Sequence, residues 1–309
     1  MRIVFFGTSS FGLPAMETLK NSPHTLLGVV TQPDKPSGRN LAPKPSAVKT
    51  WAAARALPIL EFTIDTEAEC VQQLSLMNAD VFIVISFGRL LKKNLLEMPK
   101  IAALNVHASL LPRWRGASPM QSAILAGDKE IGVGVMRMVE ALDAGDVLLE
   151  KRLPMGPRET ILTIEPKLAD LGASALIEAL ALLEKGAAHW IPQEEKAVSI
   201  CTKIKKQDGR LVWTETAEAL DRRVRAFLSW PGTFTFFNEK RIIVKRARVD
   251  AARPGQIPGR VLETGEAGIW VAASQGALVL EELQLEGRKA IAAGEFLKGF
   301  PLKSGDILI

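Results

Sequence analysis

The stretch Asn105-Val-His107-Ala-Ser-Leu-Leu-Pro112-Arg-Trp-Arg-Gly-Ala117, with the apolar run of residues 101–106 that leads into it, decides the fold. A short apolar run of this kind predicts a buried strand. Residues two apart on a strand project from the same face, so Asn105 and His107 point into one site. In an open parallel sheet, the carboxyl end of a strand opens onto the crevice where such folds bind ligands. We therefore expect a ligand site at His107.

Strands and helices alternate around this stretch. Apolar runs bounded by turn residues predict strands at 2–6, 26–31, 81–86 and 103–107, and helical composition marks residues 13–19, 47–56 and 68–77. A later strand pair, 131–138 and 147–151, places Asp143 in a loop, and a helix over 164–183 closes the domain. This alternation predicts the α/β class, a Rossmann-like, mainly parallel sheet with helices on both faces.

The chain changes character after residue 186. Turn residues, a proline and charges mark 187–205 as a linker between a domain of residues 1–186 and a domain of residues 206–309. A helix over 217–227 and short runs at 233–237, 241–249, 257–262, 268–273 and 277–284 follow. They predict a small OB-like antiparallel β-barrel as the carboxyl-terminal domain.

Composition narrows the class of protein. Cys70 and Cys201 lie far apart without histidines at ligand spacing, which indicates neither a metal site nor a disulfide framework. The amino terminus is a strand rather than a signal peptide, and no apolar run reaches membrane-spanning length. We therefore expect a cytoplasmic protein without metal or membrane contact, and a monomer.

Positive charge is concentrated in residues 196–248, which hold 13 Lys and Arg against 5 Asp and Glu. Such an excess is suited to a phosphate backbone and predicts binding of nucleic acid, with Lys203, Lys205 and Lys206 as candidates. The alternative is a solvated, charge-rich barrel surface.

Asn105, His107 and Asp143 supply an amide, an imidazole and a carboxylate without a serine or cysteine nucleophile. An amine that attacks a formyl group makes a tetrahedral oxyanion, which Asn105 and His107 can stabilise, each donor by about 3 kcal/mol. Asp143 can then assist proton transfer through a water molecule. The alternatives are a strand-end histidine without chemistry, an ordinary turn at Asp143, and a buried loop at residues 110–112.

The chain resembles the family of formyltransferases that use 10-formyltetrahydrofolate, above all the methionyl-tRNA formyltransferases. The resemblance covers nearly the whole sequence and is carried by the Asn105 to Gly116 run and by these further motifs: Phe6-Gly7-Thr8 with Phe11, Thr31-Gln-Pro-Asp-Lys-Pro-Ser-Gly-Arg39, Leu142-Asp-Ala-Gly-Asp146, Lys203 with Asp208-Gly-Arg210, Arg225-Ala-Phe227, Trp230-Pro-Gly232, Phe300-Pro-Leu-Lys303 and Gly305-Asp306.

The resemblance implies transfer of the formyl group of 10-formyltetrahydrofolate, a co-substrate, to the amino group of methionine on initiator methionyl-tRNA. It implies that Asn105, His107 and Asp143 are catalytic, and that Phe11 and Arg39 contact methionine and the acceptor stem. It also implies that folate is bound by the following residues: Phe87, Gly88, Arg89, Leu90, Leu91, Ser109, Leu110, Leu111, Pro112, Glu140, Ala141 and Leu142.

Three other functions are weighed against this one. The first, an RNA-binding protein on a degenerate enzyme fold, is disfavoured because all three catalytic positions are intact. The same chemistry on a UDP-amino sugar, or on glycinamide ribonucleotide, leaves the carboxyl-terminal domain without RNA contact, and the additional domain disfavours the second of these. A nicotinamide site is disfavoured because Gly7-Thr-Ser-Ser-Phe-Gly12 lacks the glycine spacing of dinucleotide-binding turns.

Overall fold

The structure is a computed structural model and describes residues 1–37, 42–251 and 256–309. The chain forms two compact units. Unit 1 comprises residues 1–119, 130–154 and 165–202, and unit 2 comprises residues 120–129, 155–164 and 203–309.

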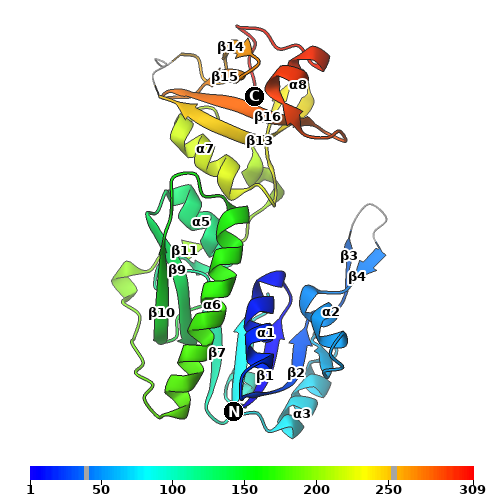
Figure 1. The fold of residues 1–309 in the computed structure, drawn as a ribbon, viewed down its shortest axis with the longest axis vertical. Coiled ribbons are helices and arrows are strands. Elements are labelled where there is room, and N and C mark those ends of the chain that lie inside the picture. The colour runs from blue at the N-terminus through cyan, green and yellow to red at the C-terminus, as the bar shows by residue number, and fades with distance from the viewer. Residues whose placement is uncertain (38–41, 252–255) are drawn as a thin grey trace. The chain divides into compact units, whose positions relative to one another are not determined.

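Unit 1 is built on a seven-stranded sheet (Figure 1). Its strand order is β10 (Val147–Pro154), β9 (Glu130–Arg137), β7 (Ala102–His107), β6 (Val81–Ile85), β1 (Arg2–Gly7), β2 (Thr25–Thr31) and β5 (Ile59–Glu61). The five strands from β7 to β5 are parallel, and β9 is antiparallel to both β7 and β10. The chain order reverses between β1 and β6, which is the switch point where such sheets bind ligands.

Helices cover both faces of this sheet, as predicted. On one face lie α1 (Leu13–Lys20) and α6 (Ile161–Glu184), which Figure 1 shows in front of the strands. The other face packs against α3 (Glu67–Met77) and α4 (Lys93–Leu96), where Cys70, Leu74 and Leu95 meet Phe6 and Phe82 in one buried cluster. The alternating side chains of these apolar strands therefore enter two cores, one on each face.

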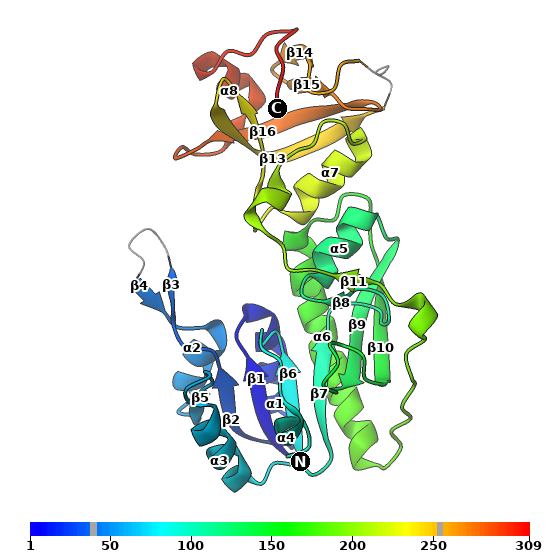
Figure 2. The same ribbon diagram turned by 180° about the vertical axis from the view of Figure 1, so that it is seen from behind.

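Several short elements complete unit 1. The 3-10 helices η1 (Ser10–Gly12) and η2 (Glu195–Ala197), helix α2 (Ala47–Ala53) and the antiparallel pair β3 (Lys35–Ser37) and β4 (Ala42–Lys44) belong to it. Strands β8 (Arg115–Gly116) and β11 (Ile200–Cys201) pair in parallel, and Figure 2 shows them side by side. Part of the segment predicted as a linker thus pairs with unit 1, and Ile191 also forms an antiparallel bridge with Val147. The predicted boundaries at residues 186 and 205 stay a prediction.

Unit 2 is centred on a six-stranded antiparallel sheet. The strands follow the order β12 (Thr233–Phe237), β13 (Lys240–Asp250), β16 (Ala277–Leu285), β15 (Gly268–Ala272) and β14 (Val261–Gly265), and β17 (Ile291–Ala292) pairs with β16. The unit also contains α5 (Pro119–Ala126), η3 (Lys206–Gly209), α7 (Ala217–Ala226) and α8 (Ala293–Gly299). The predicted antiparallel second domain is confirmed, but among the described residues no pairing joins β14 to β12, so closure into a barrel stays a prediction.

Arginines of α7 explain why two short segments from the middle of the chain belong to unit 2. Arg222 Nε donates to the Leu125 carbonyl oxygen at 2.9 Å, and Arg225 Nη1 donates to that of Glu159 at 2.8 Å. On its other side α7 buries Leu220 and Val224 in the core of the sheet. No helix among the described residues is long and apolar enough to span a bilayer.

Candidate active site

Asn105 and His107 lie at the carboxyl end of β7 and face the side of the sheet that α4 covers, because they alternate with Val106 and share the face of Ala103. His107 is buried, with 6% of its surface exposed. Asn105 is half-buried, and its side-chain amide makes no hydrogen bond to a described residue. The amide of Asn105 is thus available to a bound molecule.

His107 is held through both ring nitrogens. Its Nε2 lies 2.9 Å from the Trp114 carbonyl oxygen, and its Nδ1 lies 3.6 Å from Asp143 Oδ2. Because a carbonyl oxygen only accepts, Nε2 carries the proton in this contact. Asp143 is itself buried, at 8% exposure, so the predicted convergence of His107 and Asp143 is present in the structure.

Three consecutive residues, Trp114, Arg115 and Gly116, hold this pair, and we call them the frame tripeptide. The Trp114 carbonyl oxygen contacts His107, and the Gly116 N–H donates to Asp143 Oδ2 at 2.8 Å. Trp114 and Gly116 both have positive φ, +64° and +122°. A Cβ at Gly116 would lie 2.1 Å from the Cys201 carbonyl oxygen, so only glycine fits there.

Segment 199–202 fixes the frame tripeptide. Ser199 accepts a hydrogen bond from the Trp114 N–H at its Oγ (2.9 Å) and one from the Arg115 N–H at its carbonyl oxygen (2.9 Å). The Cys201 carbonyl oxygen accepts from the Ala117 N–H at 3.2 Å. The frame is therefore built from segments about 85 residues apart in the chain.

Gln193 connects the frame to the loop that carries Asp143. Its Nε2 donates to the carbonyl oxygens of Asp143 (2.8 Å) and Gly145 (2.7 Å), and its Oε1 accepts from Arg115 Nε (2.8 Å). Arg115 is 6% exposed and also binds Glu195 at 2.9 Å.

Sequence reasoning missed the frame tripeptide's role, as well as Gln193 and Ser199. The one available signal was Gly116 at the end of an Arg-Trp-Arg run, a position where glycine indicates an unusual backbone conformation.

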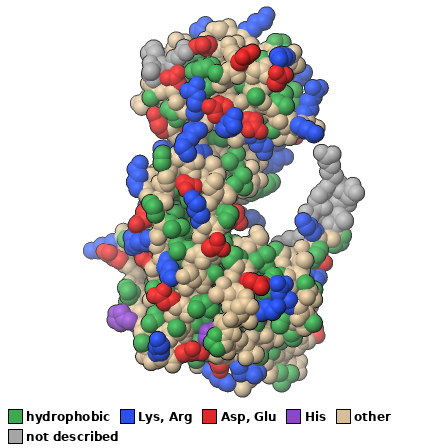
Figure 3. All heavy atoms as spheres, viewed as in Figure 1, with side chains coloured by type: hydrophobic (Ala, Val, Ile, Leu, Met, Phe, Trp, Pro, Cys, Tyr) green, Lys and Arg blue, Asp and Glu red, His purple; other side chains and the backbone are tan. Residues whose placement is uncertain are grey.

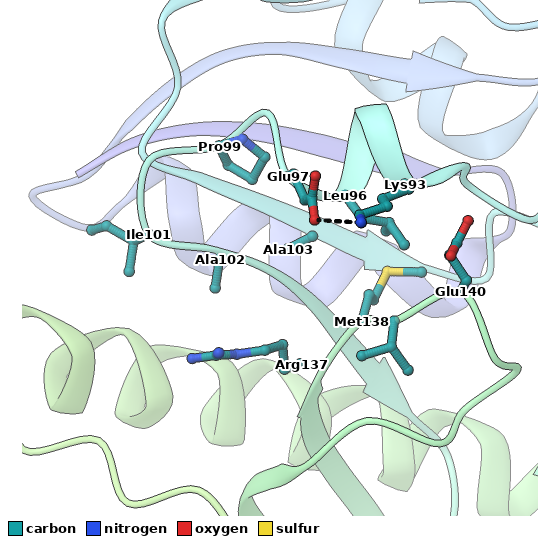
Figure 4. Close-up of a pocket in the computed structure, with 11 residues that line it drawn as sticks. Lys93, Leu96, Glu97, Pro99, Ile101, Ala102, Ala103, Arg137, Met138 and Glu140 are labelled. Carbon is teal, nitrogen blue, oxygen red and sulfur yellow. Dashed lines mark ion pairs between the residues drawn. The ribbon is translucent and has the colours of Figure 1, made fainter.

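A pocket of about 470 Å³ opens on the same side of β7, between α4 and the end of β9 (Figure 4). Figure 4 shows Met138 between Ala103 and Glu140, with Lys93 and Leu96 of α4 across from Met138. Its volume lies in the range of small-molecule sites.

The residues predicted to bind folate fall into several environments. Phe87 and Leu91 are buried in the core at 2% and 4% exposure, whereas Gly88, Arg89 and Leu90 are exposed between them. Of the predicted 140–142 segment, whose residues are all exposed, Glu140 lines the pocket.

The apolar turn after β7 is divided between core and surface. Ser109 is buried and donates from Oγ to the Arg113 carbonyl oxygen at 2.6 Å, and Leu111 packs against Met136. Leu110 and Pro112 are half-buried.

The candidate RNA-contacting residues lie elsewhere. Lys203, Lys205 and Lys206 are exposed at the start of the last segment of unit 2 and make no ion pair with a described residue. Phe11 is buried at 5% exposure, and Arg39 lies outside the described residues. In the described part of the chain, no three His, Cys, Asp or Glu side chains are placed to hold a metal ion.

Two family models match the sequence. The model described as formyl transferase matches residues 1–180, and the model described as formyl transferase, C-terminal domain, matches residues 203–301.

Relatives match over the whole chain. A methionyl-tRNA formyltransferase of Citrifermentans bemidjiense is 39% identical over 308 residues, covering 100% of this chain and 96% of the relative. One of Anaeromyxobacter dehalogenans is 41% identical over 306 residues, covering 98% of each.

Solved structures share the fold. WlaRD, a sugar 3N-formyl transferase crystallised in the presence of dTDP and 5-N-formyl-THF, has a TM-score of 0.68 at 16% identity and covers 94% of this chain and 99% of its own. Methionyl-tRNA formyltransferase from Clostridium thermocellum has a TM-score of 0.55 at 16% identity, with 82% and 95% covered.

Proposed function

This chain belongs to the formyl transferase family, and from that premise we propose that it transfers the formyl group of 10-formyltetrahydrofolate to the amino group of methionine on initiator methionyl-tRNA, which gives N-formylmethionyl-tRNA. The observation that carries the proposal is the identity of about 40% to methionyl-tRNA formyltransferases over both units. The likeness to a sugar formyltransferase is one of fold, at 16% identity.

The proposed folate position follows from the face that Ala103, Asn105 and His107 share on β7. The pocket is lined by Ile101, Ala102 and Ala103 at the amino end of β7, and a strand rises about 3.3 Å per residue, so Asn105 lies about 7 Å beyond the nearest of them. A folate whose flat ring occupies the pocket can therefore present the formyl group that it carries to Asn105 and His107.

We assign the chemical roles by what each side chain can donate or accept. The amine nitrogen forms a bond to the formyl carbon, the bond from that carbon to folate N10 breaks, and the amine proton leaves. The Asn105 amide, which binds no side chain or backbone group of the described residues, donates to the formyl oxygen as negative charge develops there. Asp143 accepts the amine proton through a water molecule, and a proton returns to N10.

His107 has a more specific place in this scheme. Its Nε2 donates to the Trp114 carbonyl oxygen and its Nδ1 faces Asp143, so the proposed contribution of His107 is an electrostatic stabilisation of the oxyanion by a ring that both partners orient. To donate directly to the formyl oxygen, Nε2 would have to leave that carbonyl.

Direct assay tests the function. We expect purified protein, given 10-formyltetrahydrofolate, to formylate initiator methionyl-tRNA and to leave a UDP-amino sugar unmodified. His107→Ala serves as the control for a contaminating activity and is expected to lower turnover by about 10²-fold or more. Formylation of the sugar nucleotide in place of the tRNA would overturn the proposal.

A further inference from the structure

We propose that Gln193 is a positioning residue for the reaction, which holds the backbone of Asp143 so that its carboxylate faces His107. The inference rests on the proposed function, because it assigns Gln193 a part in the same site. Nothing in the sequence pattern around Gln193 indicates this part, since the side chain acts on backbone atoms of a loop 48 to 50 residues earlier.

The three hydrogen bonds of the Gln193 side-chain amide are all made to residues around the His107–Asp143 pair. Both donor bonds of Nε2 end on carbonyl oxygens of the Asp143 loop, at 2.8 and 2.7 Å, and Oε1 accepts from Arg115 at 2.8 Å. A glutamine amide has two donors, so the two carbonyl bonds use them fully. The side chain thus ties the loop to the frame tripeptide at three points.

The Asp143 backbone needs such support. Its φ is +50°, in the left-handed region, which a residue with a side chain rarely adopts unless its surroundings hold it there. Two contacts do so in the structure: the Gly116 N–H binds Oδ2, and Gln193 binds the carbonyl oxygen. One fixes the side chain and the other fixes the backbone that carries it.

The Arg115 guanidinium allows the effect of a charged side chain at position 193 to be tested. Its guanidinium is buried, and it donates to Gln193 Oε1 on one side and to the exposed Glu195 on the other. A glutamate at position 193 would keep a partner for Arg115, but it would turn a carboxylate oxygen toward two carbonyl oxygens that it cannot bond. Gln193→Glu therefore removes the support of Asp143 while retaining the contact to Arg115.

Kinetics on the full chain test the proposal. We expect Gln193→Ala and Gln193→Glu to lower kcat by about 10- to 100-fold with KM changed less than twofold, because a carboxylate displaced by about 1 Å loses reactivity rather than affinity. The matched control is Gln284→Ala, which also removes a glutamine bond to a backbone carbonyl oxygen, that of Arg288 at 2.6 Å, but in unit 2. We expect it to keep the kcat of the unmodified chain.

A double-mutant cycle separates positioning from a general loss of structure. If Gln193 acts through the Asp143 carboxylate, Gln193→Ala should have little further effect in Asp143→Asn, and the two losses will not add. Additive losses, or a near-normal kcat in both Gln193 variants, would overturn the proposal.

A spectroscopic readout keeps the inference independent of the assay. The chain has three histidines, so the ring ¹⁵N signals of His107 can be assigned by comparison with His107→Ala. Gln193→Ala should move these signals, whereas Gln284→Ala should not. If the unmodified chain forms no formylmethionyl-tRNA, the proposed function fails, and unmoved His107 signals would separately refute the role of Gln193.

Discussion

At the scale of single residues, the site combines two kinds of group. His107 and Asp143 are buried and each is held by one hydrogen bond to the frame tripeptide, whereas Asn105 is half-buried and its amide binds no described residue. Because the protein already holds His107 and Asp143 in place, these side chains need no reorganisation when charge develops on the substrate. The Asn105 amide is free to form a new hydrogen bond, so we expect it to contact the substrate directly.

Asn105→Ala tests this division. We expect kcat to fall about 10²-fold or more while the affinity for methionyl-tRNA stays nearly unchanged, because an oxyanion donor acts in the transition state. Single-turnover formylation and a tRNA binding isotherm measure the two quantities. A kcat within threefold of the unmodified chain would remove Asn105 from the chemistry.

Some residues of the site could be predicted from the sequence, and others could not. Asn105 and His107 end an apolar strand, which is a pattern that period-two alternation makes visible. Gln193 and Ser199 act through backbone atoms of distant residues, and such contacts leave no spacing in the chain. Neither side chain could have been predicted to reach the site without coordinates.

At the scale of elements, the loop between β9 and β10 is packed too closely to accept a larger residue at Gly145. A Cβ there would lie 1.9 Å from the Arg137 carbonyl oxygen. We expect Gly145→Ala to lower the free energy of unfolding by about 2 kcal/mol and kcat by at least tenfold, since the loop carries Asp143. Urea unfolding and turnover measure both effects.

The control for that change is Gly299→Ala. No atom lies within 4 Å of a Cβ at this position, and Gly299 is the last residue of α8. Alanine should leave stability equal or slightly greater there. If Gly145→Ala and Gly299→Ala have the same free energy of unfolding, the close packing of Gly145 is contradicted.

The start of β6 gives a pH-dependent prediction. The Arg2 backbone N–H donates to Asp80 Oδ2 at 2.7 Å, and this bond, followed by Lys100, lowers the pKa of Asp80 from its usual 3.8. A carboxylate whose pKa is lower in the folded state than in the unfolded state stabilises the fold at pH values above 3.8. This stabilisation is lost as the pH falls from 3.8 through the pKa that Asp80 has in the folded state. Asp80→Asn should therefore cost about 1 kcal/mol at pH 7 and progressively less below pH 3.8.

Urea unfolding of both chains between pH 7 and pH 3 checks the sign. If the free energy of unfolding of Asp80→Asn stays below that of the unmodified chain by the same amount across this pH range, the charge of Asp80 is not the cause of the difference.

Element length decided which strands could be predicted. The runs that form β1, β2, β6 and β7 have five to seven residues and were predicted within one or two residues of their ends. Strands β8 and β11 have two residues each, too few to show any alternation, and α5 also was not predicted.

At the scale of the whole molecule, charge is the property that bears on a nucleic-acid substrate. On the face drawn in Figure 3, Lys and Arg side chains of unit 2 lie among Asp and Glu side chains. The lysines at 203, 205 and 206 lie close together in the chain, and their ammonium groups have no carboxylate partner among the described residues. They can therefore release counterions from a phosphate backbone without first breaking an ion pair.

Charge reversal of Lys203, Lys205 and Lys206 to Glu tests this. We expect weaker binding of methionyl-tRNA and a slope of log Kd against log salt that is shallower by about 2 to 3, with kcat at saturating tRNA retained. The matched control reverses three exposed lysines elsewhere, Lys20, Lys129 and Lys185. An unchanged slope in the first variant would mean that these lysines do not face RNA.

The pairing of β8 with β11 also bears on how the protein is made. A ribosome releases the chain from its amino end, so every strand of the seven-stranded sheet has emerged by residue 154. Ser199 and Cys201 emerge later, and until then the N–H groups of Trp114, Arg115 and Ala117 lack the acceptors that they have in the folded chain. A nascent chain is thus expected to fold its sheet first and to gain a working centre only when translation has passed residue 202.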